Sequence, residues 1–121
     1  MTLDFLKGKG IDTDAGLGYL GDEEMYNEIL KDFKDNFVTQ MNDIKAKFEA
    51  KDWANYSILV HALKSNARTL GINDLADMAY EHEKASKTPE TLDVNYLNGH
   101  VGELFAKANA VYAIIDAYFK G

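Results

Sequence analysis

Residues 52–71 read DWANYSILVHALKSNARTLG, and this stretch decides the fold. On an α-helix, where successive residues turn by about 100°, its apolar side chains form one core-facing stripe. That stripe consists of Tyr56, Leu59, Val60, Leu63, Ala67 and Leu70. His61 points the other way, toward solvent, and its neighbours on the outer face are Ser57, Lys64, Ser65 and Arg68. The outer face therefore carries one imidazole, two cations and two hydroxyl groups, and no carboxylate.

The residues on either side of this helix predict its ends and the helix that follows. Asp52 suits the N-cap position, and Gly71 suits the left-handed position just after the last turn. Asn73 or Asp74 then caps a further helix that turns Leu75, Met78, Ala79 and His82 inward. His82 is interpreted as a partly buried packing residue, and His100 as a solvated one.

Two longer apolar stripes flank this pair of helices. The first begins after an N-cap at Asp22 and is compatible with one long helix or with two joined near residues 36–39. Its members are Met25, Ile29, Phe33, Phe37, Met41, Ile44 and Phe48. The second follows Pro89, which is expected at the first turn of the last helix. Its members are Leu97, Val101, Leu104, Ala108, Val111, Ile115 and Tyr118, at heptad spacing.

These four amphipathic segments predict an all-α fold, an antiparallel four-helix bundle with short loops. We expect one domain over residues 1–121, with the bundle at 22–120. Residues 1–21 precede it as a short helix over 2–7 and a glycine-rich connector that has room for another helical turn. Met1 and the lack of a linker favour a protein that stands alone.

Composition narrows the classes of partner. The 13 basic and 20 acidic residues give a formal net charge of −7, which disfavours nucleic acid and anionic membranes as partners. The absence of cysteine excludes disulfides and thiolate metal sites. The N-terminus lacks the pattern of a signal peptide, and the longest apolar run, 110–115, is far too short to span a membrane. A cytoplasmic location and a monomeric state are expected.

Three motifs for cofactor or metal binding are rejected. Residues 16–21 match the glycine fingerprint of dinucleotide-binding proteins, but no strand precedes them and carboxylates follow at the helix start. Asp12, Asp14 and Glu23 fit part of a calcium loop whose required glycine is replaced by Leu17. No carboxylate lies three residues before any histidine, so a di-iron site is unsupported. We therefore expect no cofactor or metal bound by this chain.

His61 is the candidate nucleophile because of its neighbours on the outer face. Lys64 and Arg68 lie on the same side and would give charge-assisted contacts to a phosphoryl group. Ser65, one turn later, is small enough to let a bulky partner approach the ring. Ile58 offers an apolar rim for docking.

Residues 61–71, HALKSNARTLG, closely resemble the signature of histidine-containing phosphotransfer (HPt) domains. Similar segments are 16–26, 51–53 and 75–83, so the resemblance covers roughly 11–85. It implies that His61 is phosphorylated and that Lys64 stabilises the phosphoryl group. Ser65 stands where the family usually has glycine, which should leave docking possible. His82 stands where the family usually has an apolar residue, often leucine.

The resemblance also implies the partners. They are a hybrid histidine kinase and response-regulator receiver domains, with Mg²⁺ on the receiver, and this chain acts as a phosphocarrier without autokinase activity. Two alternatives remain open. One is a module of the same fold that binds a receiver or kinase without transfer. The other is a plain helical bundle that dimerises through Ile114, Tyr118 and Phe119.

Overall fold

The computed structural model describes residues 2–121, and every regular element in that range is a helix. The helices are α1 (Leu3–Gly8), α2 (Thr13–Leu20), α3 (Glu23–Glu49), α4 (Trp53–Thr69), α5 (Asn73–Ser86) and α6 (Val94–Lys120). The all-α prediction is confirmed. No helix in this range is both long enough and apolar enough to cross a membrane.

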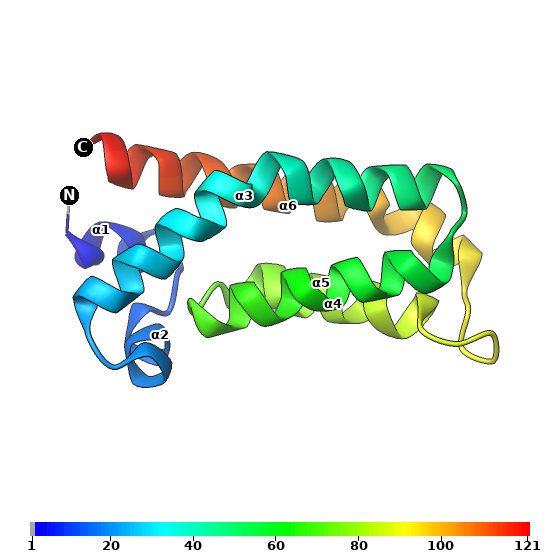
Figure 1. The fold of residues 1–121 in the computed structure, drawn as a ribbon, viewed down its shortest axis with the longest axis horizontal. Helices are drawn as coiled ribbons and strands as arrows, with labels where there is room; N and C mark the ends of the chain where they lie inside the picture. Colours follow the sequence, from blue (N-terminus) through cyan, green and yellow to red (C-terminus); the bar gives the residue numbers. More distant parts are fainter. Residues whose placement is uncertain (1) are drawn as a thin grey trace.

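The four longest helices form the body of the molecule. Contacts link α3 to α4, α4 to α5, α5 to α6 and α6 back to α3, so these helices enclose one apolar interior. Figure 1 shows α3 and α6 lying together, with α4 and α5 together beneath them, and both chain ends at the same end of the body. The connector expected at residues 12–21 is mostly helical, because α2 spans Thr13–Leu20.

α3 is one continuous helix, and its first turns run at a steeper angle than the rest (Figure 1). Phe33, Phe37, Met41 and Ile44 are buried as the apolar stripe predicted. The first two turns differ, because Tyr26 and Leu30 are buried there, whereas Met25 is 41% exposed. Since α2 packs against the start of α3 and the Tyr26 hydroxyl donates to the Leu70 carbonyl at 2.7 Å, these contacts set which face turns inward.

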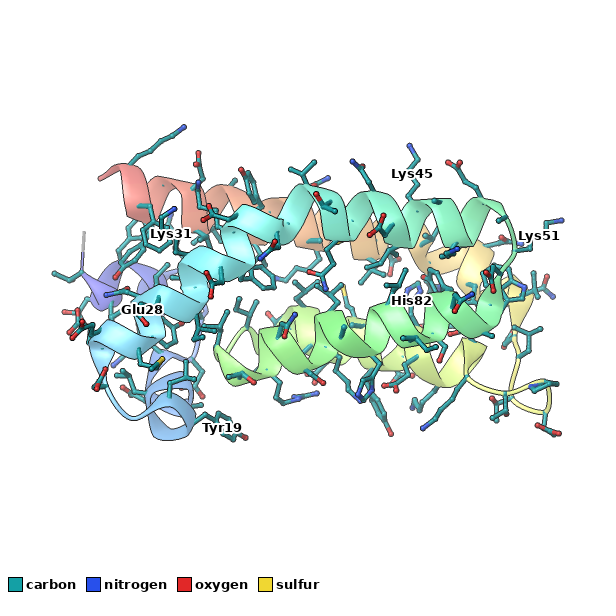
Figure 2. All side chains as sticks on the ribbon, viewed as in Figure 1. Tyr19, Glu28, Lys31, Lys45, Lys51 and His82 are labelled. Atoms are coloured by element: carbon teal, nitrogen blue, oxygen red, sulfur yellow. The ribbon has the colours of Figure 1, made fainter. Side chains whose placement is uncertain are left out.

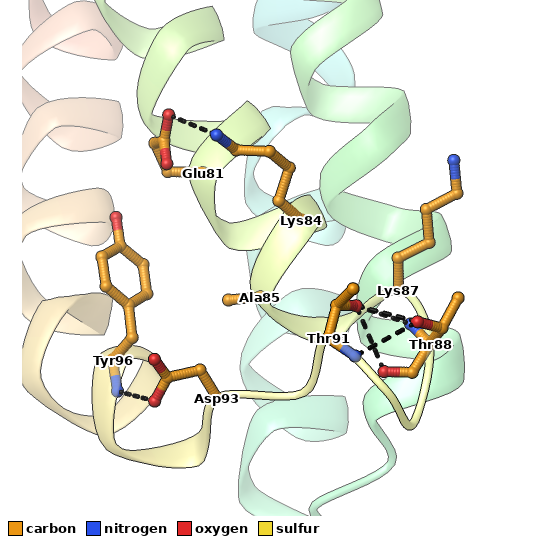
Figure 3. Close-up of a pocket in the computed structure, with 8 residues that line it drawn as sticks. All are labelled: Glu81, Lys84, Ala85, Lys87, Thr88, Thr91, Asp93 and Tyr96. Carbon is orange, nitrogen blue, oxygen red and sulfur yellow. Dashed lines mark hydrogen bonds and ion pairs between the residues drawn. The ribbon is translucent and has the colours of Figure 1, made fainter.

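Four predicted helix starts can be compared with the structure. The Asp22 and Asp52 side chains accept hydrogen bonds from Met25 N and Asn55 N, so both caps are confirmed. The predicted cap at Asn73 or Asp74 is wrong, because α5 already begins at Asn73 and its cap position is Ile72, which makes no side-chain cap hydrogen bond. The prediction for Pro89 is wrong: α6 begins at Val94, and its cap is the Asp93 side chain, which accepts from Tyr96 N at 3.0 Å (Figure 3).

The segment around Pro89 is a turn because Thr88 and Thr91 bond each other through their side chains and backbone (Figure 3). The last helix nevertheless buries its predicted stripe, with only Val101 partly exposed. Tyr118 is 7% exposed and donates to Asn27 Oδ1 at 2.6 Å. That burial removes Tyr118 from the surface that the dimer alternative requires.

Gly71 forms the tight link between α4 and the N-terminal segment. Its φ is +78°, and Asp12 N donates to its carbonyl at 2.8 Å. A Cβ at this position would lie 1.9 Å from the Asp12 carbonyl oxygen. Only glycine satisfies both the backbone angle and the close approach.

We therefore expect Gly71→Ala to lower the free energy of unfolding by about 2 kcal/mol, through backbone strain and displacement of residues 11–13. Urea unfolding measures this loss. Gly18→Ala is the matched control, because a Cβ there meets nothing within 4 Å. Equal stability of the two variants would contradict the expectation.

Candidate functional site

The site begins with His61 in the middle of α4. Its side chain is 55% exposed, although its helix packs against both α3 and α5. Val60 and Leu63 on either side of it are fully buried, so the backbone of α4 is anchored in the core at this point. The sequence-based orientation of His61 toward solvent is confirmed. Ser57 was expected on the same outer face and is instead 7% exposed.

A carboxylate that the sequence analysis missed contacts the imidazole. Glu83, on α5, lies with its Oε2 atom 2.6 Å from His61 Nδ1. The other oxygen, Oε1, accepts a hydrogen bond from Lys64 Nζ at 2.6 Å. The Glu83 side chain is 7% exposed, so one nearly buried carboxylate bridges the candidate nucleophile and the candidate stabilising cation.

The bridge fixes the ionisation of Glu83. Burial alone would raise the pKa of its carboxyl, but the hydrogen bonds and charges of Lys64 and His61 outweigh burial and hold the pKa below its usual range. An ionised carboxylate has no proton to donate. His61 Nδ1 must therefore carry the hydrogen in this contact, and in the neutral ring Nε2 keeps a free lone pair.

The two predicted cations of the site are both paired. Lys64 bonds Glu83, and Arg68 Nη2 lies 3.1 Å from Asp77 Oδ1, also on α5. The positive patch expected from α4 alone is therefore balanced by acidic residues of the neighbouring helix. Ser65 is exposed, as is Ile58 at 64%, so both are accessible to a partner that approaches this face of α4.

The sequence does hold a signal for Glu83. α4 and α5 pack closely and are joined by a three-residue turn, 70–72. In such a hairpin, residues at similar distances before and after the turn face each other. His61 lies 10 residues before Gly71 and Glu83 lies 12 after it. Arg68 and Asp77 also lie on opposite sides of this turn, and periodicity along one helix cannot show either contact.

The other two histidines make contacts that differ from those of His61. His82 is buried, as predicted, and its Nδ1 lies 2.7 Å from the Tyr56 hydroxyl, in the interior between the helices (Figure 2). His100 was expected to be solvated, but it is partly buried. Its ring stacks on Tyr96 at 4.2 Å between centroids, and its Nδ1 is buried without a hydrogen-bond partner. Neither offers an exposed nitrogen held by a carboxylate.

The one comparison that matched is with a protein family. Residues 28–108, more than half of the chain, match the family model described as Hpt domain. The match includes His61, Lys64 and Glu83 and excludes α1 and α2. No curated protein and no solved structure matched the chain significantly. The chain therefore belongs to the Hpt domain family, whose members are phosphocarrier modules that act in histidine phosphotransfer within phosphorelays.

Proposed function

We propose that this protein accepts a phosphoryl group from the phospho-aspartate of a receiver domain onto His61 and passes it to the aspartate of a second receiver. The observation that supports this most directly is the exposed His61 ring, whose Nδ1 is held by the ionised Glu83. The platform in this proposal is an antiparallel four-helix bundle of α3 to α6. The upstream kinase is a hybrid histidine kinase whose receiver delivers the phosphoryl group.

The geometry suggests which nitrogen reacts. The Nε2 lone pair attacks phosphorus and forms the N–P bond, and the P–O bond to the receiver aspartate breaks. The aspartate carboxylate leaves with the electron pair. The ring gains positive charge as the bond forms, and its Nδ1 proton remains hydrogen-bonded to Glu83. Because Glu83 is already in place and ionised, it stabilises the charge that develops in the transition state.

The other site residues have supporting roles in this proposal. Lys64 stabilises the phosphoryl group, and Arg68 adds charge one turn further along α4. Ser65 leaves room for the receiver to approach. The receiver supplies Mg²⁺, which neutralises charge on the transferring group. Because no segment resembles an ATP-binding domain, we propose that the chain does not phosphorylate itself.

The test is incubation of the protein with a phosphorylated receiver and Mg²⁺. We expect the chain to gain a phosphate that is labile in acid and stable in base, with NMR placing it on Nε2. Adding a second, unphosphorylated receiver should remove it. If a full panel of phosphorylated receivers from the same organism transfers nothing while some of them bind, the non-transferring alternative holds and the proposal is wrong.

Glu83→Gln should slow phosphoryl transfer about tenfold, which corresponds to the loss of one charge-assisted hydrogen bond. The amide oxygen still accepts from Nδ1, so the ring stays oriented while the negative charge is lost. Rapid-quench measurement of the transfer rate gives the effect.

Glu81→Gln is the matched control for Glu83→Gln, because Glu81 is an exposed carboxylate on the same helix that bonds Lys84. Its transfer rate should equal that of the native protein. A Glu83→Gln variant that transfers as fast as the Glu81→Gln variant would show that Glu83 has only a structural role.

A further inference from the structure

Tyr80 lies beside the site, with two ammonium groups over its ring. It is 43% exposed and precedes Glu83 by three residues, so both occupy one side of α5. Lys64 Nζ lies 5.2 Å from the ring centroid and Lys84 Nζ lies 4.7 Å from it. Distances below about 6 Å are within the range of cation–π attraction. The ring is therefore a second partner for the Lys64 ammonium besides Glu83.

We propose that Tyr80 is a positioning residue that holds the Lys64 ammonium at the site when His61 is phosphorylated, an inference that rests on the proposed function. Lys64 has a long, flexible stem, and fixing it costs rotamer entropy. Its side chain is only 20% exposed although its helix position faces outward. The ring face and the Glu83 carboxylate together restrict where the ammonium can go.

Two groups hold the Lys64 ammonium, the Glu83 carboxylate and the Tyr80 ring, and their chemistry explains why the ring is needed. Glu83 is negative, so it repels a phosphoryl group on His61 and competes with it for Lys64. An aromatic face attracts a cation through its quadrupole but carries no net charge. Tyr80 can therefore keep Lys64 close without opposing the incoming phosphoryl group. Glu83 meanwhile accepts the hydrogen bond from His61 Nδ1 through its other oxygen.

The second cation on the ring provides an internal control. Lys84 Nζ bonds Glu81 at 3.1 Å, and both side chains are half exposed. Lys84 and Glu81 also line a surface pocket of about 470 Å³ between the end of α5 and the start of α6 (Figure 3). His61 and Lys64 are not among the residues that line this pocket. Lys84 thus shares the ring with Lys64 but not its contact with Glu83.

The first experiment measures the geometry without phosphate. A proton over an aromatic face is shifted upfield, so we compare the NMR shifts of the Lys64 ε-methylene protons in native, Tyr80→Phe and Tyr80→Leu proteins. The upfield shift should be present in the first two and absent in Tyr80→Leu. An unchanged shift in Tyr80→Leu overturns the proposal, whether or not the protein transfers phosphate.

The second experiment measures transfer from a phosphorylated receiver in a double-mutant cycle. Tyr80→Leu should slow transfer about threefold, and Tyr80→Phe should stay near the native rate. In a Lys64→Ala background, Tyr80→Leu should have no further effect, and Lys84→Ala alone should leave the rate unchanged. An equal effect of Tyr80→Leu with and without Lys64 overturns the proposal. Absence of any transfer by the native protein instead refutes the proposed function, and the NMR result still decides the role of Tyr80.

Discussion

His61→Gln is expected to abolish phosphate uptake from every receiver while leaving the fold intact. Glutamine has no ring nitrogen with a free lone pair, so no N–P bond can form at this position. Because the His61 side chain is 55% exposed, its replacement opens no core cavity. The glutamine amide can still donate to Glu83. Phosphate retained on the protein, measured by radiolabel after base treatment, gives the result.

His100→Gln is the matched control for this experiment. It removes a histidine that stacks on Tyr96 and takes no part in the Glu83 bridge. The variant should take up as much phosphate as the native protein, and both variants should unfold in urea as cooperative single transitions. Label that persists in His61→Gln and is lost in His100→Gln would contradict the assignment, because the nucleophile would then be His100 on α6.

Much of the fold could be predicted from the sequence because single helices report their own buried faces. The stripes of α4 and α6 and the caps at Asp22 and Asp52 follow from spacing and short-range hydrogen bonds. The errors lie where contacts with another segment decide which face of a helix is buried or where the helix begins. α2 packs on the start of α3, so that Tyr26 is buried there instead of Met25. Pro89 lies in a turn closed by Thr88 and Thr91, so α6 begins only at Val94.

The site shows the same division between local and tertiary information. Periodicity along α4 placed His61 outward and Lys64 on the same side, and the structure agrees. The Glu83 bridge and the Tyr80 ring come from α5, so they depend on how two helices pair. Consequently the sequence predicted a positive patch, whereas the folded protein pairs each of these two cations with a carboxylate. Charge on one helix is a poor guide to the potential at a surface built from two.

His82 is expected to make the protein less stable as the pH falls from about 6.5 toward 4. Its ring is 2% exposed, and burial, followed by the nearby charge of His100, lowers its pKa from 6.5 to about 4. The groups around it are Tyr56 on α4, Glu81 on its own helix, and Tyr96 and His100 on α6. The Tyr56 hydroxyl satisfies the neutral ring but adds no negative charge that would favour protonation.

The sign follows from proton binding in the two states. Between pH 6.5 and 4 the unfolded chain binds a proton at His82 that the folded protein does not bind. The free energy of unfolding therefore decreases as the pH falls through this window. A displacement from 6.5 to about 4 corresponds to about 3 kcal/mol lost by pH 4, with the full contribution present above about pH 6.5.

Urea unfolding at pH 7 and pH 4.5 in two variants isolates this effect. The reference is Tyr56→Phe, and the test protein is Tyr56→Phe with His82→Leu, so that no tyrosine hydroxyl loses its partner in the comparison. The carboxyl groups that titrate at acid pH, Glu83 among them, are common to both proteins and cancel. We expect the reference to lose about 2 kcal/mol more than the leucine variant between the two pH values, because pH 4.5 covers most of the window.

Equal losses in the two proteins would show that His82 binds its proton in the folded state as readily as in the unfolded chain. The buried ring would then need an acidic hydrogen-bond partner, whereas among residues 2–121 its side-chain partner is the Tyr56 hydroxyl.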